Sequence, residues 1–243
     1  MDRLEQLERW LASRDSEVRF TLAPASADAS FRRYFRVAFE RRTPATVIVM
    51  DAPPERENCR PFVHVAQLLA AAGLNAPRIL DQDLAQGFLL LTDLGTTTYL
   101  AALQSSSDET VADRLFADAV DALIRWQLAS RRDVLPPYDT SLLRRELELF
   151  PDWYVARHLG VTLTPAQRAV LDRAFALIIG SNLAQPHVYV HRDYMPRNLM
   201  ISDPNPGILD FQDAVFGPIT YDVASLFKDA FITWDEEIGR AHV

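Results

Sequence analysis

"VYVHRDYMPRNLMISDPNPGILDFQDAVFGP", from Val188 to Pro218, carries the strongest indication of how this chain folds. Short apolar runs in it are typical of strands, and the turn-forming segment SDPNPG separates the last two. Asp193, Asn198 and Asp210 interrupt these runs where the strands end. The pattern therefore predicts a hairpin that brings two carboxylates and one amide oxygen to the same edge.

This grouping suits phosphoryl transfer. Asn198 and Asp210 offer hard oxygen ligands of the kind that magnesium shares with substrate phosphates. Asp193 could then accept the proton of an attacking hydroxyl group. A zinc site is less favoured because no second His and no Cys lie nearby. A retaining glycosidase needs two carboxylates but neither the Asn nor the hairpin. Taken singly, each of the three residues is also typical of a turn or cap.

The composition limits the classes of function. The chain has 243 residues, 49% of them hydrophobic, which is enough for one large domain or two lobes. A net charge of -8 and a pI near 5.1 do not favour a broad nucleic-acid surface. The single cysteine excludes an intrachain disulfide. Neither a signal-peptide pattern nor a membrane-length apolar run is present, so we expect a cytoplasmic protein without a membrane span.

The first 95 residues and the remainder differ in pattern. Five strand-like segments, among them the alternating FRRYFRVAF, with one helical segment inserted, predict an antiparallel-type sheet with an inserted helix. Residues 97–184 are almost wholly helical in pattern, with a break expected at Pro151 and a helix start at Thr164-Pro165. The sequence thus predicts an α+β architecture, with a β-rich lobe over 1–95 and a helical lobe over 96–243.

The last residues depart from this pattern. Residues 237–243, EIGRAHV, do not continue the helical periodicity. We expect that they are not native and that the helical lobe is incomplete.

Several motifs resemble those of known kinases. HRDYMPRN resembles the His-Arg-Asp-x4-Asn catalytic loop of the protein-kinase fold, and DFQ stands where protein kinases have Asp-Phe-Gly. The segment DFQDAVFGPITYDVASL is instead similar to the aminoglycoside phosphotransferase family of small-molecule kinases. DASFRRYFRV and LLLTDLG resemble the phosphate-loop region and the hinge of one branch. LELFPDWYVARHLG and VIVMDAPP resemble the bacterial cell-wall sugar kinases that phosphorylate N-acetylmuramate and N-acetylglucosamine at the anomeric hydroxyl.

The resemblance implies a bilobal protein-kinase-like fold, a nucleotide (ATP) with Mg2+, and a role for each matching residue. Asp193 would be the catalytic base and His191 would brace its loop. Asn198 and Asp210 would hold the magnesium. The nucleotide would contact Ser26, Asp28, Ala29, Ser30, Met50, Thr92, Asp93 and Leu94. The sugar would contact Asp152, Trp153, Tyr154 and Arg197.

Some of these residues have structural alternatives. Trp153 and Tyr154 could be core aromatics at a helix kink, and Met50 could fill the core. Asp222 is expected to accept hydrogen bonds from loop backbone at a helix start.

One feature of the kinase pattern is missing. Met50 stands where kinases place a lysine that pairs with phosphate, and the only lysine of the chain is Lys228. Either Arg32, Arg33 or Arg36 replaces it, or the site relies on magnesium and backbone donors. Strand alternation puts Arg33 on one face and the other two arginines on the opposite face.

Together these features predict an ATP-dependent kinase of a small-molecule sugar in peptidoglycan recycling. We expect a monomer with no nucleic-acid or membrane partner. An aminoglycoside or amino-alcohol phosphotransferase of the same fold is an alternative. So is a nucleotide-binding protein without catalysis, which Met50 favours and the intact Asp193, Asn198 and Asp210 oppose.

Overall fold

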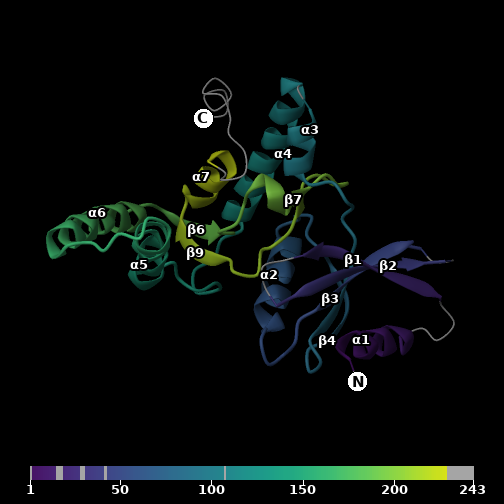
Figure 1. Cartoon of the computed structure of the whole chain (residues 1–243). Helices are drawn as coiled ribbons and strands as arrows, with labels where there is room; N and C mark the ends of the chain where they lie inside the picture. The colour runs from purple at the N-terminus through teal and green to yellow at the C-terminus, as the bar shows by residue number, and fades with distance from the viewer. Residues whose placement is uncertain (1, 15–18, 28–30, 41–42, 107, 229–243) are drawn as a thin grey trace. The chain divides into compact units, whose positions relative to one another are not determined.

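A computed structural model describes residues 2–14, 19–27, 31–40, 43–106 and 108–228. The chain divides into two compact units, the first made of Met1–Ala119 with Pro196–Gln212 and the second of Val120–Met195 with Asp213–Val243. Both contain helices and strands, so the expected α+β class is confirmed (Figure 1). The expected lobe boundary at residue 95 stays a prediction.

The first unit is built on a five-stranded antiparallel sheet, as the sequence predicts. Its strands have the spatial order β1-β2-β3-β5-β4, and α2, Cys59–Ala71, is inserted between β3 and β4. The strands are β1 Phe20–Ala27, β2 Arg33–Phe39, β3 Thr46–Asp51, β4 Ile79–Asp83 and β5 Phe88–Thr92. The small residues of ASADAS, 25–30, predict a turn, and this prediction is wrong for residues 25–27, because β1 continues through Ala27 after a register shift between Pro24 and Ser26.

Helix α1, Arg3–Ala12, covers one face of this sheet. Leu7, Trp10 and Leu11 pack there with strand residues such as Val37 and Val49. The buried apolar area of such a cluster is the main stabilising contribution of this layer. The second face of the sheet is therefore the one that remains for a ligand site.

A distant segment of the chain completes the first unit. Strands β7, Leu199–Met200, and β8, Gly207–Ile208, form the predicted hairpin. It is joined to the earlier part of the unit by backbone hydrogen bonds, from the Ile208 amide to the Asn75 carbonyl at 2.7 Å and from Ile201 to Thr97 at 2.9 Å. The 3-10 turn η2, Pro196–Asn198, precedes the hairpin, and α3, Tyr99–Ser105, contacts both. Asn198 and Asp210 thus belong to the unit that holds the sheet.

The second unit is mainly helical around a small two-stranded sheet. Strand β6, His187–Val190, pairs antiparallel with β9, Val215–Pro218. Its helices are α5 Thr140–Leu149, α6 Pro165–Leu183 and α7 Tyr221–Phe227, and α4, Glu109–Leu128, has residues in both units. The core of this unit contains Tyr138, Leu143, Ile179, Val190 and Val215.

The break expected at Pro151 is a change of helix type, because α5 ends at Leu149 and the chain stays helical. After α5 the chain continues without interruption as a π-helix, η1, Phe150–His158. The Leu159 amide donates to the Tyr154 carbonyl five residues earlier, at 3.0 Å. Proline has no amide hydrogen for an i→i−4 bond, so a wider turn is tolerated at this point.

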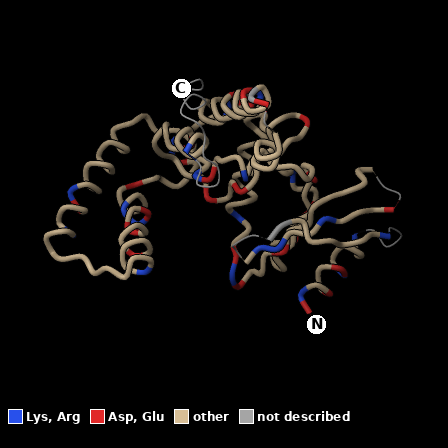
Figure 2. The backbone as a smooth tube through the Cα atoms, turned by 45° about the horizontal axis from the view of Figure 1, so that its top comes forward, with Lys and Arg blue, Asp and Glu red and all other residues tan. Residues whose placement is uncertain are grey.

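Among the described residues, no helix is both long and apolar enough to cross a membrane. Acidic and basic positions are interspersed along the described chain, including α5 (Figure 2).

Candidate functional site

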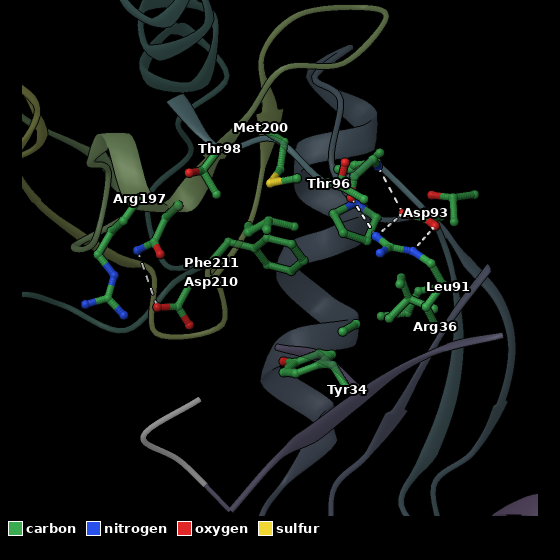
Figure 3. Close-up of a pocket in the computed structure, with 18 of the residues that line it drawn as sticks. Tyr34, Arg36, Leu91, Asp93, Thr96, Thr98, Arg197, Met200, Asp210 and Phe211 are labelled. Atoms are coloured by element: carbon green, nitrogen blue, oxygen red, sulfur yellow. Dashed lines mark hydrogen bonds and ion pairs between the residues drawn. The ribbon is translucent and has the colours of Figure 1, made fainter. Parts of the chain in front are cut away.

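A cavity of about 390 Å³ opens in the first unit, on the second face of the sheet (Figure 3). Tyr34 and Arg36 of β2 and Ile48 of β3 line it from the sheet, and Phe62 lines it from α2. Six of the predicted site residues also line it, namely Thr92, Asp93, Leu94, Arg197, Asn198 and Asp210. The cavity therefore brings the expected hinge together with the expected metal ligands.

Asn198 and Asp210 are neighbours because Asn198 directly precedes β7 and Asp210 follows β8, at the open end of the hairpin. The Leu209 amide donates to the Asn198 carbonyl at 2.9 Å, which extends the hairpin by one pair. The Asn198 Nδ2 atom lies 3.4 Å from Asp210 Oδ2. Asp210 has φ 62°, a left-handed conformation that Asp tolerates better than most residues. This backbone places the Asp210 carboxylate in the cavity, beside Arg197 and Phe211 (Figure 3).

These donor atoms fit a magnesium ion. Mg2+ prefers oxygen ligands and is commonly held by one or two protein carboxylates together with substrate phosphates. Asp210 supplies a carboxylate and the Asn198 side chain carries an amide oxygen, both within a cavity that has space for a ligand. Gln212 donates to Asp210 Oδ1 at 2.8 Å and fixes the orientation of that carboxylate.

The hinge is held by an ion pair that the sequence analysis did not assign. Arg36 donates to the two carboxylate oxygens of Asp93, at 2.7 and 3.1 Å, and to the Gly95 carbonyl at 2.7 Å. Although burial opposes ionisation of Asp93, hydrogen bonds from Arg36, Gly95 and Thr46 lower its pKa. Asp93 is thus a charged residue that fixes the hinge segment, and both oxygens of its carboxylate already accept hydrogen bonds from Arg36.

The remaining expected nucleotide contacts are less clearly placed. Met50 is fully buried, and it is not among the described residues that line the cavity. Ser26 pairs with Tyr34 in the β1–β2 ladder. Asp28, Ala29 and Ser30 lie outside the described residues. Their contacts with a nucleotide stay predictions.

The loop that carries Asp193 belongs to the second unit. His191 is buried, and its Nδ1 accepts a hydrogen bond from the Asp193 amide at 3.3 Å. The backbone amides of His191 and Arg192 donate to the Asp222 carboxylate at 2.6 and 3.0 Å. Asp222 therefore holds the loop backbone, as expected. Burial raises the pKa of the Asp222 carboxyl to about 7.

A second acidic residue holds the same loop. Arg192 has φ 79°, and its Nη2 lies 2.5 Å from Glu146 Oε1 of α5. Tyr138 also donates to Glu146. Burial, and then the hydrogen bond with Glu146, raise the pKa of Tyr138. Arg192 is therefore engaged within its own unit. The position of Asp193 relative to Asn198 and Asp210 stays a prediction.

Comparison with known proteins adds an independent observation. The sequence profile described as "Phosphotransferase enzyme family" matches residues 21–243. The chain belongs to the phosphotransferase enzyme family.

Named relatives of this phosphotransferase are found in bacteria. It is 60% identical, over 215 residues, to a protein of Pseudomonas aeruginosa named N-acetylmuramate/N-acetylglucosamine kinase. That match covers 88% of this chain and 62% of the relative. A protein of Pseudomonas putida with the same name is 53% identical, over 96% of this chain and 70% of its own length. The chain thus spans about two thirds of the length of these relatives.

The fold is also that of solved phosphotransferases. The streptomycin-ATP-APH(2")-IIa ternary complex superposes with a TM-score of 0.65 at 14% identity. The match covers 97% of this chain and 79% of that one. The expected kinase-like fold is confirmed.

Three of the four expected sugar contacts, Asp152, Trp153 and Tyr154, lie on η1 in the second unit, whereas Arg197 lies on η2 in the first. Trp153 and Tyr154 are about half exposed. The Arg157 guanidinium lies 3.8 Å from the centre of the Trp153 ring, and Tyr154 stacks on Phe150 and His158 at 5.6 and 5.4 Å. Neither ring is the core residue of the alternative interpretation. Asp152 is exposed, and its contact with a sugar, like that of both rings, stays a prediction.

Sequence reasoning missed three residues that shape the site. Gln212 could have been noticed because it occupies the glycine position of Asp-Phe-Gly. Arg36 was considered only as a lysine replacement, not as the partner of Asp93. Glu146 gave no signal, because its partner Arg192 is 46 residues away in the sequence.

Proposed function

We propose that this phosphotransferase transfers the γ-phosphoryl group of ATP to the anomeric hydroxyl of N-acetylmuramate or N-acetylglucosamine. The observation that carries the proposal is the cavity in which Asn198 and Asp210 lie side by side, facing the hinge residues. The named Pseudomonas relatives support the choice of sugar, at 60% and 53% identity.

The residues of the chain have separate roles in this reaction. Asp193 accepts the proton of the attacking sugar hydroxyl, and His191 holds the loop that carries it. The hinge residues Thr92, Asp93 and Leu94 position the nucleotide. Trp153 and Tyr154 offer aromatic surface to the sugar, with Asp152 and Arg197 as polar contacts.

Asn198 and Asp210 would hold Mg2+ when it is bound. The ion would neutralise negative charge on the phosphates of the nucleotide. The protein itself contributes the positioning of the groups and the fixed dipoles around them.

The cellular setting follows from this reaction. Because the phosphoryl donor is ATP, we place the enzyme in the cytoplasm, where it would act as a monomer in peptidoglycan recycling. Its partners would be the nucleotide and the small sugar.

A radiolabelled phosphate-transfer assay with ATP and magnesium tests the proposal. Incubation with N-acetylmuramate and N-acetylglucosamine should yield labelled sugar phosphates that are acid-labile, as anomeric phosphates are. Absence of transfer to both sugars, in protein that binds ATP, would contradict the proposed acceptor.

The structural similarity to the streptomycin-ATP-APH(2")-IIa complex favours a second candidate, an aminoglycoside kinase. Streptomycin, kanamycin and choline in parallel reactions distinguish it. Transfer to one of these, and not to the N-acetylated sugars, would establish the second candidate in place of the first.

A further inference from the structure

We propose that Arg32, held by Glu57, binds the phosphates of the nucleotide in place of the lysine that is absent at Met50. The inference rests on the proposed function and deepens it, because it assigns a binding residue that neither the cavity lining nor the comparisons identify. It follows from the different partners of three neighbouring arginines.

Two of these arginines, Arg33 and Arg36, form ion pairs with other parts of the first unit. Arg33 Nη2 lies 2.5 Å from Asp51 Oδ2, and Arg3 of α1 lies 2.7 Å from the other oxygen of this fully buried carboxylate. Arg33 therefore serves the face of the sheet that α1 covers. Arg36 binds both oxygens of Asp93 and the Gly95 carbonyl, so it belongs to the hinge.

Arg32 lies on the cavity side of the sheet. Side chains alternate between the faces of a strand, and Tyr34 and Arg36 of β2 both line the cavity. Continuing this alternation one residue before the start of β2 puts Arg32 on the same face. Tyr34 is directly opposite Met50 in the β2–β3 register. Arg32 is therefore a diagonal neighbour of the position where kinases carry the lysine.

Arg32 also lies at the end of this face where the phosphates of a bound nucleotide are expected. Arg36, at one end of this face, pairs with the hinge at Asp93. Arg32 is four residues away, which corresponds to about 13 Å along a strand. A nucleotide whose base lies beside the hinge would extend its phosphates away from Arg36, along this face and toward Arg32.

Glu57 gives Arg32 a fixed orientation. Arg32 Nη2 lies 3.0 Å from Glu57 Oε2, and the two side chains are only 10% and 13% exposed. Glu57 also accepts the Phe31 amide at 3.2 Å, so it ties down the backbone that enters β2. It stands just before α2, and the pair joins sheet to helix as the lysine–glutamate pair of protein kinases does. A guanidinium has five donors in a planar fork, enough for a carboxylate and a phosphate together.

Calorimetric binding of ATP and adenosine to the full chain tests this inference. In Arg32→Gln, ATP affinity should fall about ten-fold or more, as expected for loss of charge-assisted hydrogen bonds, while adenosine affinity changes less than about two-fold. Arg32→Lys should recover part of the loss, because the positive charge remains. Arg33→Gln is the matched control, since it removes an ion-paired arginine from the adjacent position on the opposite face.

Thermal unfolding of each variant is measured alongside. An equal loss of affinity for ATP and adenosine in Arg32→Gln would show a purely structural role and overturn the inference. So would unchanged ATP affinity in a variant that remains folded. If the wild-type chain binds no ATP, the proposed function itself fails and the inference with it, a result distinct from the other two.

Discussion

At the residue scale, Glu146 is the clearest positioning group for the loop that carries Asp193. Its carboxylate accepts hydrogen bonds from Arg192, Tyr138 and Tyr221. We predict that Glu146→Gln lowers kcat about 10- to 100-fold, because small displacements of a catalytic group have effects of this size. The Kd for ATP, measured by calorimetry, should stay unchanged.

Glu148 offers a matched control for this prediction. It lies on the same helix but pairs only with Arg144 and Arg168 in the interactions described, at the surface of α5 and α6. These side chains are 25–36% exposed, and ion pairs that are partly open to solvent contribute little to stability. Glu148→Gln should therefore keep wild-type kcat, and equal losses in the two variants would argue against a specific role for Glu146.

Asp222 predicts a pH dependence of stability. Its pKa in the folded chain, about 7, is raised by burial above the unfolded value near 3.9. Because the folded chain binds the Asp222 proton more tightly than the unfolded chain does, the contribution of this group to stability is fully present below about pH 4. It is lost as the pH rises toward 7, where the buried carboxyl must ionise. The free energy of unfolding of the wild type, relative to Asp222→Asn, should thus decrease over this interval in urea titrations. Parallel pH profiles of the two proteins would contradict the assignment.

At the element scale, the turn between β4 and β5 depends on Gly87. Its φ is 74°, and a Cβ atom there would lie 1.9 Å from the Ala52 carbonyl oxygen. The Ala52 amide donates a hydrogen bond to the Gly87 carbonyl at 2.8 Å, so neither segment can move away without losing this hydrogen bond. We predict that Gly87→Ala lowers the free energy of unfolding by more than the roughly 1–2 kcal/mol of left-handed strain alone.

Gly73 separates the two contributions. It has φ 70°, but nothing lies within 4 Å of the position that a methyl group would take there. Gly73→Ala should therefore lower the free energy of unfolding only by the left-handed strain. A denaturation experiment in which Gly73→Ala destabilised the chain more than Gly87→Ala would refute the close approach at Ala52.

The elements that the sequence predicts well are those with a local signal. The strands are alternating segments such as β2, RYFRVAF, or short apolar runs such as β5, FLLLT, and Thr164 with Pro165 marks the start of α6. The π-helix η1 was not predictable, because apolar spacing does not distinguish an i→i−5 bond from an i→i−4 bond over nine residues. The extension of β1 through Ala27 was missed because small side chains carry no alternation.

At the scale of the whole molecule, the candidate site was predictable where one hairpin determines it. Asn198 and Asp210 meet because β7 and β8 pair. The ion pairs of Arg36 and Arg192 join residues 57 and 46 positions apart, and only the tertiary fold brings them together. Local pattern thus indicated which oxygen-bearing side chains lie together, whereas the groups that orient them required the structure.

The most direct test of the phosphotransferase account is turnover of Asp193→Asn, with ATP binding measured on the same protein. Loss of the base should reduce transfer to N-acetylmuramate about 100-fold or more, while ATP binds as to the wild type. If Asp193→Asn bound ATP and turned over at the wild-type rate, Asp193 would not be the base and the proposed mechanism of transfer would be wrong.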